Sequence, residues 1–431
     1  KKLSDLTADE LNYSGAKLRN TASNDDVNDF FRTGATFNNS ISVSGGTETV
    51  RTYFSYANSY SDGMMRNNNY KRNTLSFRQS YSLFNKKLNV DLSLNYVQAK
   101  TKNRPGGGTV MNPLYDLYRM PRNVDLNYYK ENYYIENGKW TSNEQSYFDS
   151  KNNKWTTGTV ELTGPKQEWA YWQNGMNNPY WMVNTRNSIS EEERAYGYIS
   201  ANYQIIDGLK IQGRLSLDRT KMKGTSERMA TTWNISAMED YGMYGQDLNW
   251  INEVYVDALL SYDKQIKDFS ISATTGWTGH TLKGETQKLW AKATTANWKH
   301  DTMPTLINFF EPSVSQGNVS ERSYTLSSNW DKGLLFTGQI GWQEKVYLEG
   351  SYRRDWYRAF KQYSYRGTPT NYGYFSVGAN ALLHQIVTLP EVITNLKVRA
   401  SYSEVGNSIP NVLYNARNTD PLTGAAVPSS Y

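Results

Sequence analysis

The chain has 431 residues, a formal net charge of +6 and a mean hydropathy of −0.73. It is too long for one typical soluble domain, and it contains no apolar run of the length that a membrane-spanning helix needs. The small charge excess is spread along the chain, which argues against a nucleic-acid-binding stripe. Cysteine is absent, so disulfides and thiolate metal sites are excluded.

Residues 1–36 are polar and precede the first complete strand. Thr7 and Glu10 have the spacing of a capping box, which predicts a short helix toward Leu11. The sequence begins without Met or a signal peptide and ends in a loop over 406–431. We therefore expect it to be part of a longer protein.

Long segments that alternate apolar with polar residues follow, and the clearest covers residues 88–98. Side chains of a strand point alternately to its two faces, so one face of this segment is apolar and the other polar. The apolar face carries Leu88, Val90, Leu92, Leu94 and Tyr96. The polar face carries Asn89, Asp91, Ser93 and Asn95.

The segment 209–218 repeats this pattern. Its apolar face carries Leu209, Ile211, Leu215 and Leu217. Its polar face carries Lys210, Gln212, Arg214, Ser216 and Asp218. Two such segments with one wet and one apolar face are typical of a barrel wall whose polar face lines a lumen.

About twelve strands are predicted in this way, and most are nine to thirteen residues long. They cover 37–44, 50–60, 70–82, 88–99, 195–205, 209–220, 251–263, 269–277, 332–342, 346–357, 374–384 and 396–405. Turns of a few residues alternate with long loops, notably 100–192, 221–250 and 282–331. We therefore predict an all-β, antiparallel up-and-down transmembrane barrel over 37–405, with the short turns in the periplasm.

A soluble β-sandwich is the alternative fold, but strands of soluble domains average five or six residues. Aromatic residues at the strand ends favour the membrane, because amphipathic rings prefer the headgroup level. Cross-strand packing would also explain them. They are Tyr60, Tyr81, Tyr96, Tyr262, Trp277, Trp342, Trp356 and Tyr357.

No motif of enzyme or metal chemistry is present. His280, His300 and His384 lack the spacing of metal ligands, and the glycine-rich segment 104–108 is not followed by the Lys and Ser or Thr of a phosphate-binding loop. The acidic triplet 191–193 is interpreted as the solvated base of a loop. We predict no catalytic residue, no metal and no cofactor.

The loop 100–192 is the candidate ligand-binding segment, because it is rich in Trp and Tyr interleaved with Asn, Gln and Glu. Flat rings stack on the C–H face of a sugar while amides and carboxylates bind its hydroxyl groups. The alternative is that the rings pack a small core of the loop itself. The candidate residues are Trp140, Trp155, Trp169, Tyr171, Trp172 and Trp181.

Several short motifs, taken in order, resemble the barrel of SusC/RagA-type TonB-dependent outer-membrane transporters. They are Asp29–Gly34, Asn39–Gly46, Thr52–Tyr56, Asp62-Gly63, Tyr70–Asn73, Asn112–Tyr115, Pro121–Leu126, Tyr347–Ser351, Arg354–Trp356, Leu396–Tyr402 and Val405–Asn407. Each motif is short, but their order and spacing extend over 29–407.

This resemblance implies a 22-stranded barrel in the outer membrane of a Gram-negative bacterium of Bacteroidota type, with a plug inside it. It also implies a TonB box, TonB as energy-coupling partner, and a SusD-like surface lipoprotein as lid. The cargo would be a glycan or a peptide, with glycan the commoner one. Only about half of such a barrel is present here, without plug or TonB box.

In the implied mechanism, loops and lid hold the cargo above the lumen and TonB opens a path through the plug. The polar faces would line that path through Asn89, Asp91, Asn95, Lys210, Gln212, Arg214 and Asp218. Two alternatives remain open: a passive porin-like channel, and a secreted, soluble β-rich carbohydrate-binding protein.

Overall fold

The computed structural model describes residues 25–106, 112–120, 124–149, 151–169, 175–234, 237–238, 242–292, 319–362, 370–390 and 392–406. Its main element is a twelve-stranded antiparallel sheet in the order β1-β2-β3-β4-β7-β8-β11-β12-β13-β14-β15-β16. The bounds of these strands are β1 Ala35–Gly46, β2 Val50–Asp62, β3 Asn69–Leu83, β4 Leu88–Lys102, β7 Asn187–Ile206, β8 Leu209–Arg228, β11 Met243–Ile266, β12 Phe269–Lys292, β13 Val319–Trp342, β14 Val346–Tyr357, β15 Asn371–Leu382 and β16 Lys397–Ser403.

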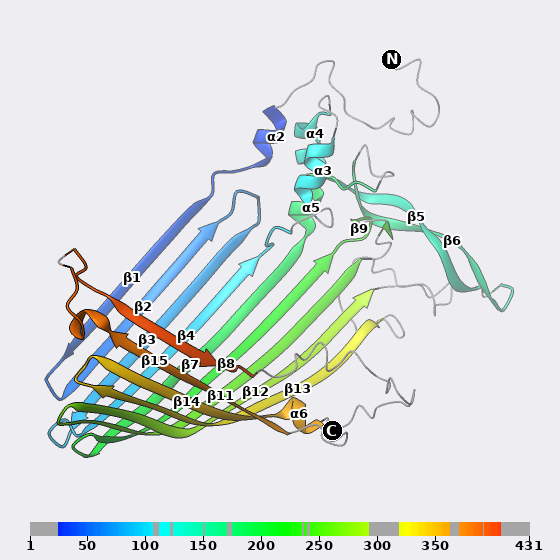
Figure 1. Cartoon of the computed structure of the whole chain (residues 1–431). Coiled ribbons are helices and arrows are strands. Elements are labelled where there is room, and N and C mark those ends of the chain that lie inside the picture. The colour runs from blue at the N-terminus through cyan, green and yellow to red at the C-terminus, as the bar shows by residue number, and fades with distance from the viewer. Residues whose placement is uncertain are drawn as a thin grey trace.

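Most of the smaller elements lie at the end of the sheet where the long connections are (Figure 1), whereas η5 lies between β15 and β16 at the other end. Two short hairpins, β5–β6 and β9–β10, are separate from the main sheet. The bounds of the smaller elements are α2 Asp25–Phe30, α3 Pro113–Arg119, α4 Leu126–Glu131, β5 Tyr134–Asp149, β6 Lys154–Gln167, α5 Pro179–Thr185, β9 Trp233–Asn234, β10 Ala237–Met238, α6 Arg358–Gln362 and η5 Leu383–Gln385.

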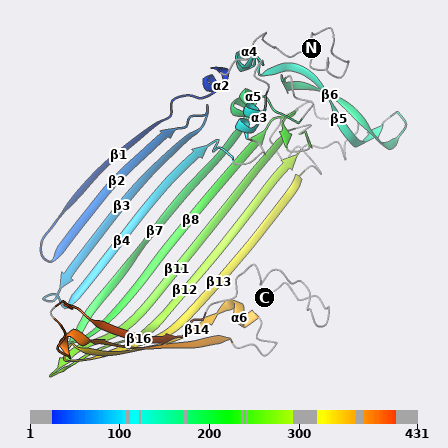
Figure 2. The same cartoon turned by 45° about the horizontal axis from the view of Figure 1, so that its top comes forward.

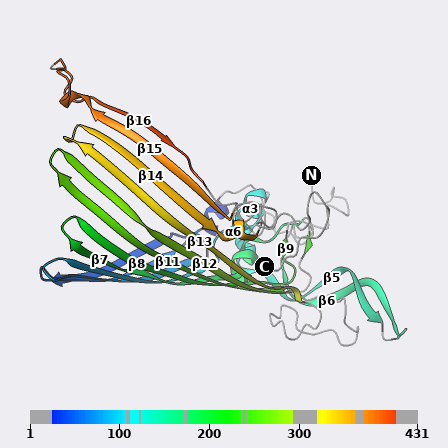
Figure 3. The same ribbon diagram turned by 60° about the horizontal axis from the view of Figure 1, so that its bottom comes forward.

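The sheet is an open, curved partial barrel. Its strands run side by side from short turns at one end to long connections at the other (Figure 2). Strands β14 to β16 turn up from the plane of the others, so the sheet forms a trough (Figure 3). The two outermost strands, β1 and β16, do not pair with each other.

All twelve predicted strands are strands of this sheet, but several extend further than the sequence predicts. β8 continues to Arg228, β11 begins at Met243, and β12 and β13 each have 24 residues. Toward the long connections both faces of a strand carry polar residues. The alternation of apolar and polar residues ends there, although the backbone hydrogen bonds between strands continue. The predicted helix at Thr7 lies outside the described residues.

The two faces of the sheet differ as the alternation predicts. Leu94 is 53% exposed, whereas its neighbour Ser93 is 6% exposed. Directly paired residues of antiparallel strands point to the same face, and the ladder pairs Leu94 with Phe77 and Gly197. We call the apolar face the outer face and the polar face the inner wall. The inner wall is the concave face of the sheet. Its side chains converge, and residues such as Asp257 and Asp355 are therefore buried.

No helix in the described part of the chain is long and apolar enough to cross a membrane.

Expressed alone, residues 1–431 are expected not to form a stable monomer in a bilayer or detergent. Strands β1 and β16 each have one partner in the described sheet, and an unpaired backbone group in lipid costs several kcal/mol. Aggregation at these edges should therefore compete with insertion. Heat modifiability on denaturing gels measures this, and a folded, heat-modifiable monomer of residues 1–431 would show the expectation to be wrong.

Candidate functional site

The inner wall carries all seven polar residues that the sequence assigns to a lumen. Asn89, Asp91 and Asn95 alternate with outer-face residues on β4, and Lys210, Gln212, Arg214 and Asp218 do so on β8. Most of them are half-buried, and Lys210 is exposed. Whether any of them contacts a ligand stays a prediction.

Several of these side chains are held by partners on the neighbouring strand. Asp91 accepts a hydrogen bond from Ser80 Oγ at 2.6 Å, and Asn89 accepts one from Ser82 Oγ at 2.7 Å. The Asp218 carboxylate is bound by the Arg194 guanidinium, whose Nε donates at 2.9 Å. Cross-strand pairs of this kind give the inner wall a fixed polar pattern.

The most buried carboxylate on β11 anchors one part of this pattern. Asp257 is 2% exposed. It accepts hydrogen bonds from Arg214 Nε at 2.7 Å and from Gln212 Nε2 at 3.2 Å. A buried carboxylate needs such partners because desolvation of the charge is costly. Two predicted lumen residues therefore have a structural role in addition to any contact with a ligand.

Two further clusters were not foreseen from the sequence. Asp355, also 2% exposed, accepts hydrogen bonds from Arg353 Nε at 2.8 Å and from Tyr374 Oη at 2.6 Å. His280 lies between Asp331 and Glu253, with 2.8 Å between each ring nitrogen and its carboxylate. The strand register brings His280 to Asp331, 51 positions away in sequence, and Tyr374 to Asp355, 19 positions away.

A hollow on the inner wall offers a contact surface for a ligand. It is lined by aromatic rings and by charges of both signs, notably Arg78, Tyr196, Tyr198, Asp218, Glu253 and Tyr255. Rings beside carboxylates and a guanidinium can bind a polar chain such as a peptide or an oligosaccharide. Among the described residues, no cluster of three or more His, Asp or Glu has the geometry to hold a metal ion.

The candidate aromatic residues of the long loop are mostly packed inside it. Trp140, Trp169 and Trp181 are 3%, 6% and 1% exposed. Trp169 packs edge-on against Tyr129, with 4.9 Å between ring centroids, and Trp181 Nε1 donates to Thr232 Oγ1 at 2.8 Å. Trp155 lies in β6, and Tyr171 and Trp172 lie outside the described residues.

Trp169 belongs to a compact core at the long-connection end of the sheet, which we call the loop core. This core joins α2, α3, α4 and α5 to Met65 in the connection between β2 and β3. Its buried apolar residues are Phe30, Met65, Leu117, Val124, Leu126, Tyr129, Trp169, Met176, Tyr180 and Val183. The buried rings Trp140, Trp169 and Trp181 fit the second interpretation of the loop, in which rings pack inside the protein, and a role of any candidate ring in ligand binding stays a prediction.

Buried amides lock the strands of the loop core together. Gln167 donates from Nε2 to Asn177 Oδ1 at 3.1 Å and accepts from the Asn178 backbone N–H at 3.0 Å. Asn178 also caps α5 by accepting from the Tyr180 N–H at 2.8 Å. Asn177 reaches the next loop, accepting from the Trp233 N–H at 2.8 Å. The connection between β4 and β7 is thereby tied to the connection between β8 and β11.

One acid of the loop core has an altered pKa. Asp116 is 5% exposed and accepts a hydrogen bond from the Asn177 backbone N–H at 3.1 Å. Burial raises the pKa of its carboxyl to about 6, against the lowering effects of that hydrogen bond and of Arg119. The neutral carboxyl is therefore the form that the folded loop core favours.

Comparisons with known proteins bear on the fold. No family model matches the sequence, and no curated protein is significantly similar to it. Among solved structures, the RagAB peptide importer in its open-open state aligns with a TM-score of 0.65 and 17% identity, over 94% of this chain and 43% of that chain. Its closed-closed state gives 0.63 with the same identity and coverage. A further RagAB peptide transporter structure gives 0.61 and 17% identity, over 90% and 38%.

The fold is that of a TonB-dependent transporter barrel. The chain spans about two fifths of the length of these transporter chains. The open sheet with two free edges is therefore part of a barrel wall, as the resemblance of the sequence motifs implies.

Replacing Asp257 by Ala should destabilise the barrel wall. The variant leaves Arg214 and Gln212 without their shared acceptor, and we expect a loss of about 1–3 kcal/mol, toward the lower value because Arg214 is partly solvated. The thermal midpoint of heat modifiability of the intact barrel measures it. Lys210→Ala, at an exposed position of the same wall, is the control and should leave the midpoint unchanged; an equal shift in both would contradict the role of Asp257.

The stability of the loop core should depend on the protonation of Asp116. Because the folded pKa is above the unfolded value of 3.8, this group stabilises the fold below about pH 4, and the contribution is lost as pH rises through about 6. Asp116→Asn removes the charge and keeps an acceptor, so the loop core should become more stable at pH 7, by at most about 3 kcal/mol.

Hydrogen exchange of the α3 and α5 amides, corrected for the intrinsic rate at each pH, reports this stability. Glu131→Gln, at an exposed position of α4, is the matched control and should behave as the parent chain. Unchanged protection in Asp116→Asn at pH 7 would show that the ionised carboxyl does not destabilise the loop core.

Proposed function

We propose that the protein is part of an energised outer-membrane importer of nutrient oligomers in a Gram-negative bacterium. The single observation that carries this proposal is the match of the whole curved sheet to RagAB peptide transporters, at a TM-score of up to 0.65. The importer would be coupled to TonB and would work beneath a SusD-like surface lipoprotein.

The two faces of the sheet suit this function. An outer face of exposed Leu, Ile, Phe and Tyr matches lipid, and an inner wall of paired charges and amides matches a wet lumen. The hollow lined by Arg78, Tyr198 and Glu253 is open on this wall, where a polar chain in transit would pass. No residue is required to make or break a covalent bond.

The cargo that we favour is a peptide, with an oligosaccharide as the second candidate. The sequence-based preference for a glycan depends on the Trp residues of the long loop, and Trp140, Trp169 and Trp181 are buried, Trp169 in the loop core. The solved transporters with the same fold are named for peptides. The mixed charges of the hollow suit a chain that carries both amino and carboxylate groups.

The loop core would serve as a rigid platform for the lipoprotein lid. Gln167, Asn177 and Trp233 tie the β4–β7 connection to the β8–β11 connection, so the surface presented to a lid would move as one body. A passive porin needs no such platform, and a secreted binding protein needs no apolar outer face.

Purification of the intact parent protein from native membranes tests the proposal. We expect a surface lipoprotein at one-to-one stoichiometry, and bound peptides that mass spectrometry identifies. Uptake of those peptides should stop when the proton gradient is dissipated. Uptake that persists without the gradient would support a passive pore, and recovery in the soluble fraction would support the secreted protein.

Tyr198→Ala tests the hollow itself. Removal of an exposed ring from the lining of the hollow should raise the peptide concentration at half-maximal uptake about tenfold, the equivalent of about 1.4 kcal/mol. Ser42→Ala, on the inner wall far along the sheet at β1, is the control and should leave uptake unchanged. Equal uptake by the two variants would show that cargo does not contact the hollow.

A further inference from the structure

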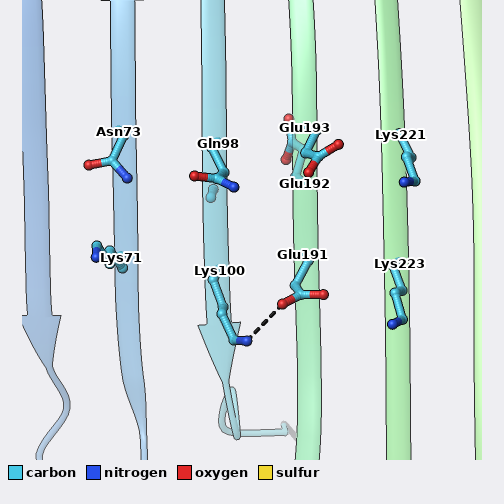
Figure 4. A pocket seen from close by; sticks show the side chains of 10 residues that line it. Lys71, Asn73, Gln98, Lys100, Glu191, Glu192, Glu193, Lys221 and Lys223 are labelled. Atoms are coloured by element: carbon cyan, nitrogen blue, oxygen red, sulfur yellow. Dashed lines mark hydrogen bonds and ion pairs between the residues drawn. The ribbon is translucent and has the colours of Figure 1, made fainter.

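A cluster of basic side chains lies on the outer face of the sheet, beyond the apolar band. Lys71 of β3, Lys100 of β4, and Lys221 and Lys223 of β8 lie side by side, with Glu191 and Glu193 of β7 between them (Figure 4). We call these six residues the basic patch. The strand ladder fixes it, because Lys100 pairs with Lys71 and Glu191, and Glu191 pairs with Lys223.

The patch belongs to the outer face and not to the lumen. Lys100 has the parity of Leu92, Leu94 and Tyr96 on β4. Lys221 and Lys223 have the parity of Leu215 and Leu217 on β8. Glu192, between the two patch acids, points to the opposite face. The chain therefore changes from apolar to basic along one face of the barrel wall.

The height of the patch is set by its distance from the short turns. Lys100 lies about twelve residues beyond Leu88, and Lys221 about twelve beyond Leu209. At about 3.3 Å per residue and a strand tilt of about 40°, this is ~30 Å above the turns. An apolar barrel band is about 25 Å tall, so the patch lies just above the hydrocarbon, on the side of the long loops.

The other rim of the outer face differs. Next to the short turns the outer face is apolar and aromatic, and its charged pair, Lys264 with Asp207, is neutralised internally. The flanking residues there are Tyr81, Leu83, Leu88, Tyr203, Leu209, Tyr262, Phe269 and Trp342. On the outer face of the strands, the cluster of lysines therefore lies at the rim of the long loops, whereas lysines at the other rim, such as Lys86 and Lys267, lie in the turns.

The basic patch has an excess of positive charge that an anionic ligand could neutralise. It holds four lysines against two glutamates, and the contact of Lys100 Nζ with Glu191 at 2.7 Å is its ion pair. Arg219 lies on the same face of β8, two residues below Lys221, and is exposed. Ammonium groups in this number, at headgroup level, suit a dianionic phosphate.

We propose that the basic patch binds the phosphorylated headgroup of the outer-leaflet glycolipid, lipid A. The acyl chains would lie along Leu94, Leu215 and Leu217 below the patch, and the phosphates would meet the lysines above it. The proposal rests on the outer-membrane location in the proposed function and not on import. Lipid bound here would hold the wall at a fixed height beneath the lid.

Native mass spectrometry of the intact parent barrel in nanodiscs tests the proposal. One nanodisc preparation contains lipid A, and a second contains the same lipid without its phosphates. We expect the parent barrel to retain the phosphorylated lipid about tenfold more strongly. Replacing Lys71, Lys100, Lys221 and Lys223 by Gln should reduce its retention to that of the dephosphorylated lipid.

The matched control removes four lysines at the opposite rim. Lys86, Lys87, Lys267 and Lys345 lie in or beside the short turns, and their replacement by Gln should leave retention as in the parent. Equal retention of both lipids by the parent, or an equal loss in both quadruple variants, would overturn the proposal. So would a patch variant that keeps lipid A and instead loses a co-purifying surface protein. If uptake fails while lipid retention is intact, the proposed import function would be wrong and the lipid proposal would stand.

Discussion

Backbone hydrogen bonding in lipid is the constraint on which the rest of this structure depends. A strand that crosses hydrocarbon must pair all of its N–H and C=O groups with neighbouring strands, since no water is available to them. The twelve strands meet this demand through a continuous antiparallel ladder from β1 to β16. Side chains are then free to differ between the two faces, so one face can match lipid while the other lines water.

The inner wall shows how charge is kept in such a sheet. Asp257 and Asp355 are almost fully buried, yet each is bound by an arginine and by further polar groups on adjacent strands. Because the contacts of Arg214 with Asp257 and of Tyr374 with Asp355 span strand interfaces, the same contacts that satisfy the charge also fix the register. A wall lined in this way is polar, and its side chains are held in fixed positions by their partners.

The long connections obey a different rule, because above the membrane they can bury an apolar core of their own. Leu126, Tyr129 and Trp169 fill that core, and buried amides such as Gln167 and Asn178 bind backbone groups beside it. The rigidity of this end thus depends on ordinary soluble-protein packing placed on a membrane scaffold. The buried rings of the loops therefore hold the shape of this end of the protein, whereas the charges of the inner wall keep that wall polar.

The sequence predicts the barrel wall well because alternation is a local signal. Every second residue of Leu88–Tyr96 reports its face without knowledge of any partner. The upper strand ends were missed where both faces become polar, as from Lys221 to Arg228 on β8. The partners of Asp257 and the bridge of His280 between Glu253 and Asp331 depend on register, which a single sequence does not encode locally.

The aromatic residues of the long loop illustrate a further limit of sequence reasoning. A Trp that stacks on a ligand and a Trp that fills a core have the same composition and the same polar neighbours in sequence. Only burial separates them, and burial of Trp169 and Trp181 arises from helices α3 to α5, which carry no long periodic pattern.

The same separation of local from long-range information explains why the sequence alone did not predict the basic patch. Lys71, Lys100 and Lys221 are unremarkable within their own segments, and the acidic triplet beside them is naturally interpreted as a solvated loop base. Counting each strand from its own short turn places these residues at one height. Because the lipid boundary is also a surface of constant height, charges that are scattered in sequence become a single feature only when the turns are used as the reference level.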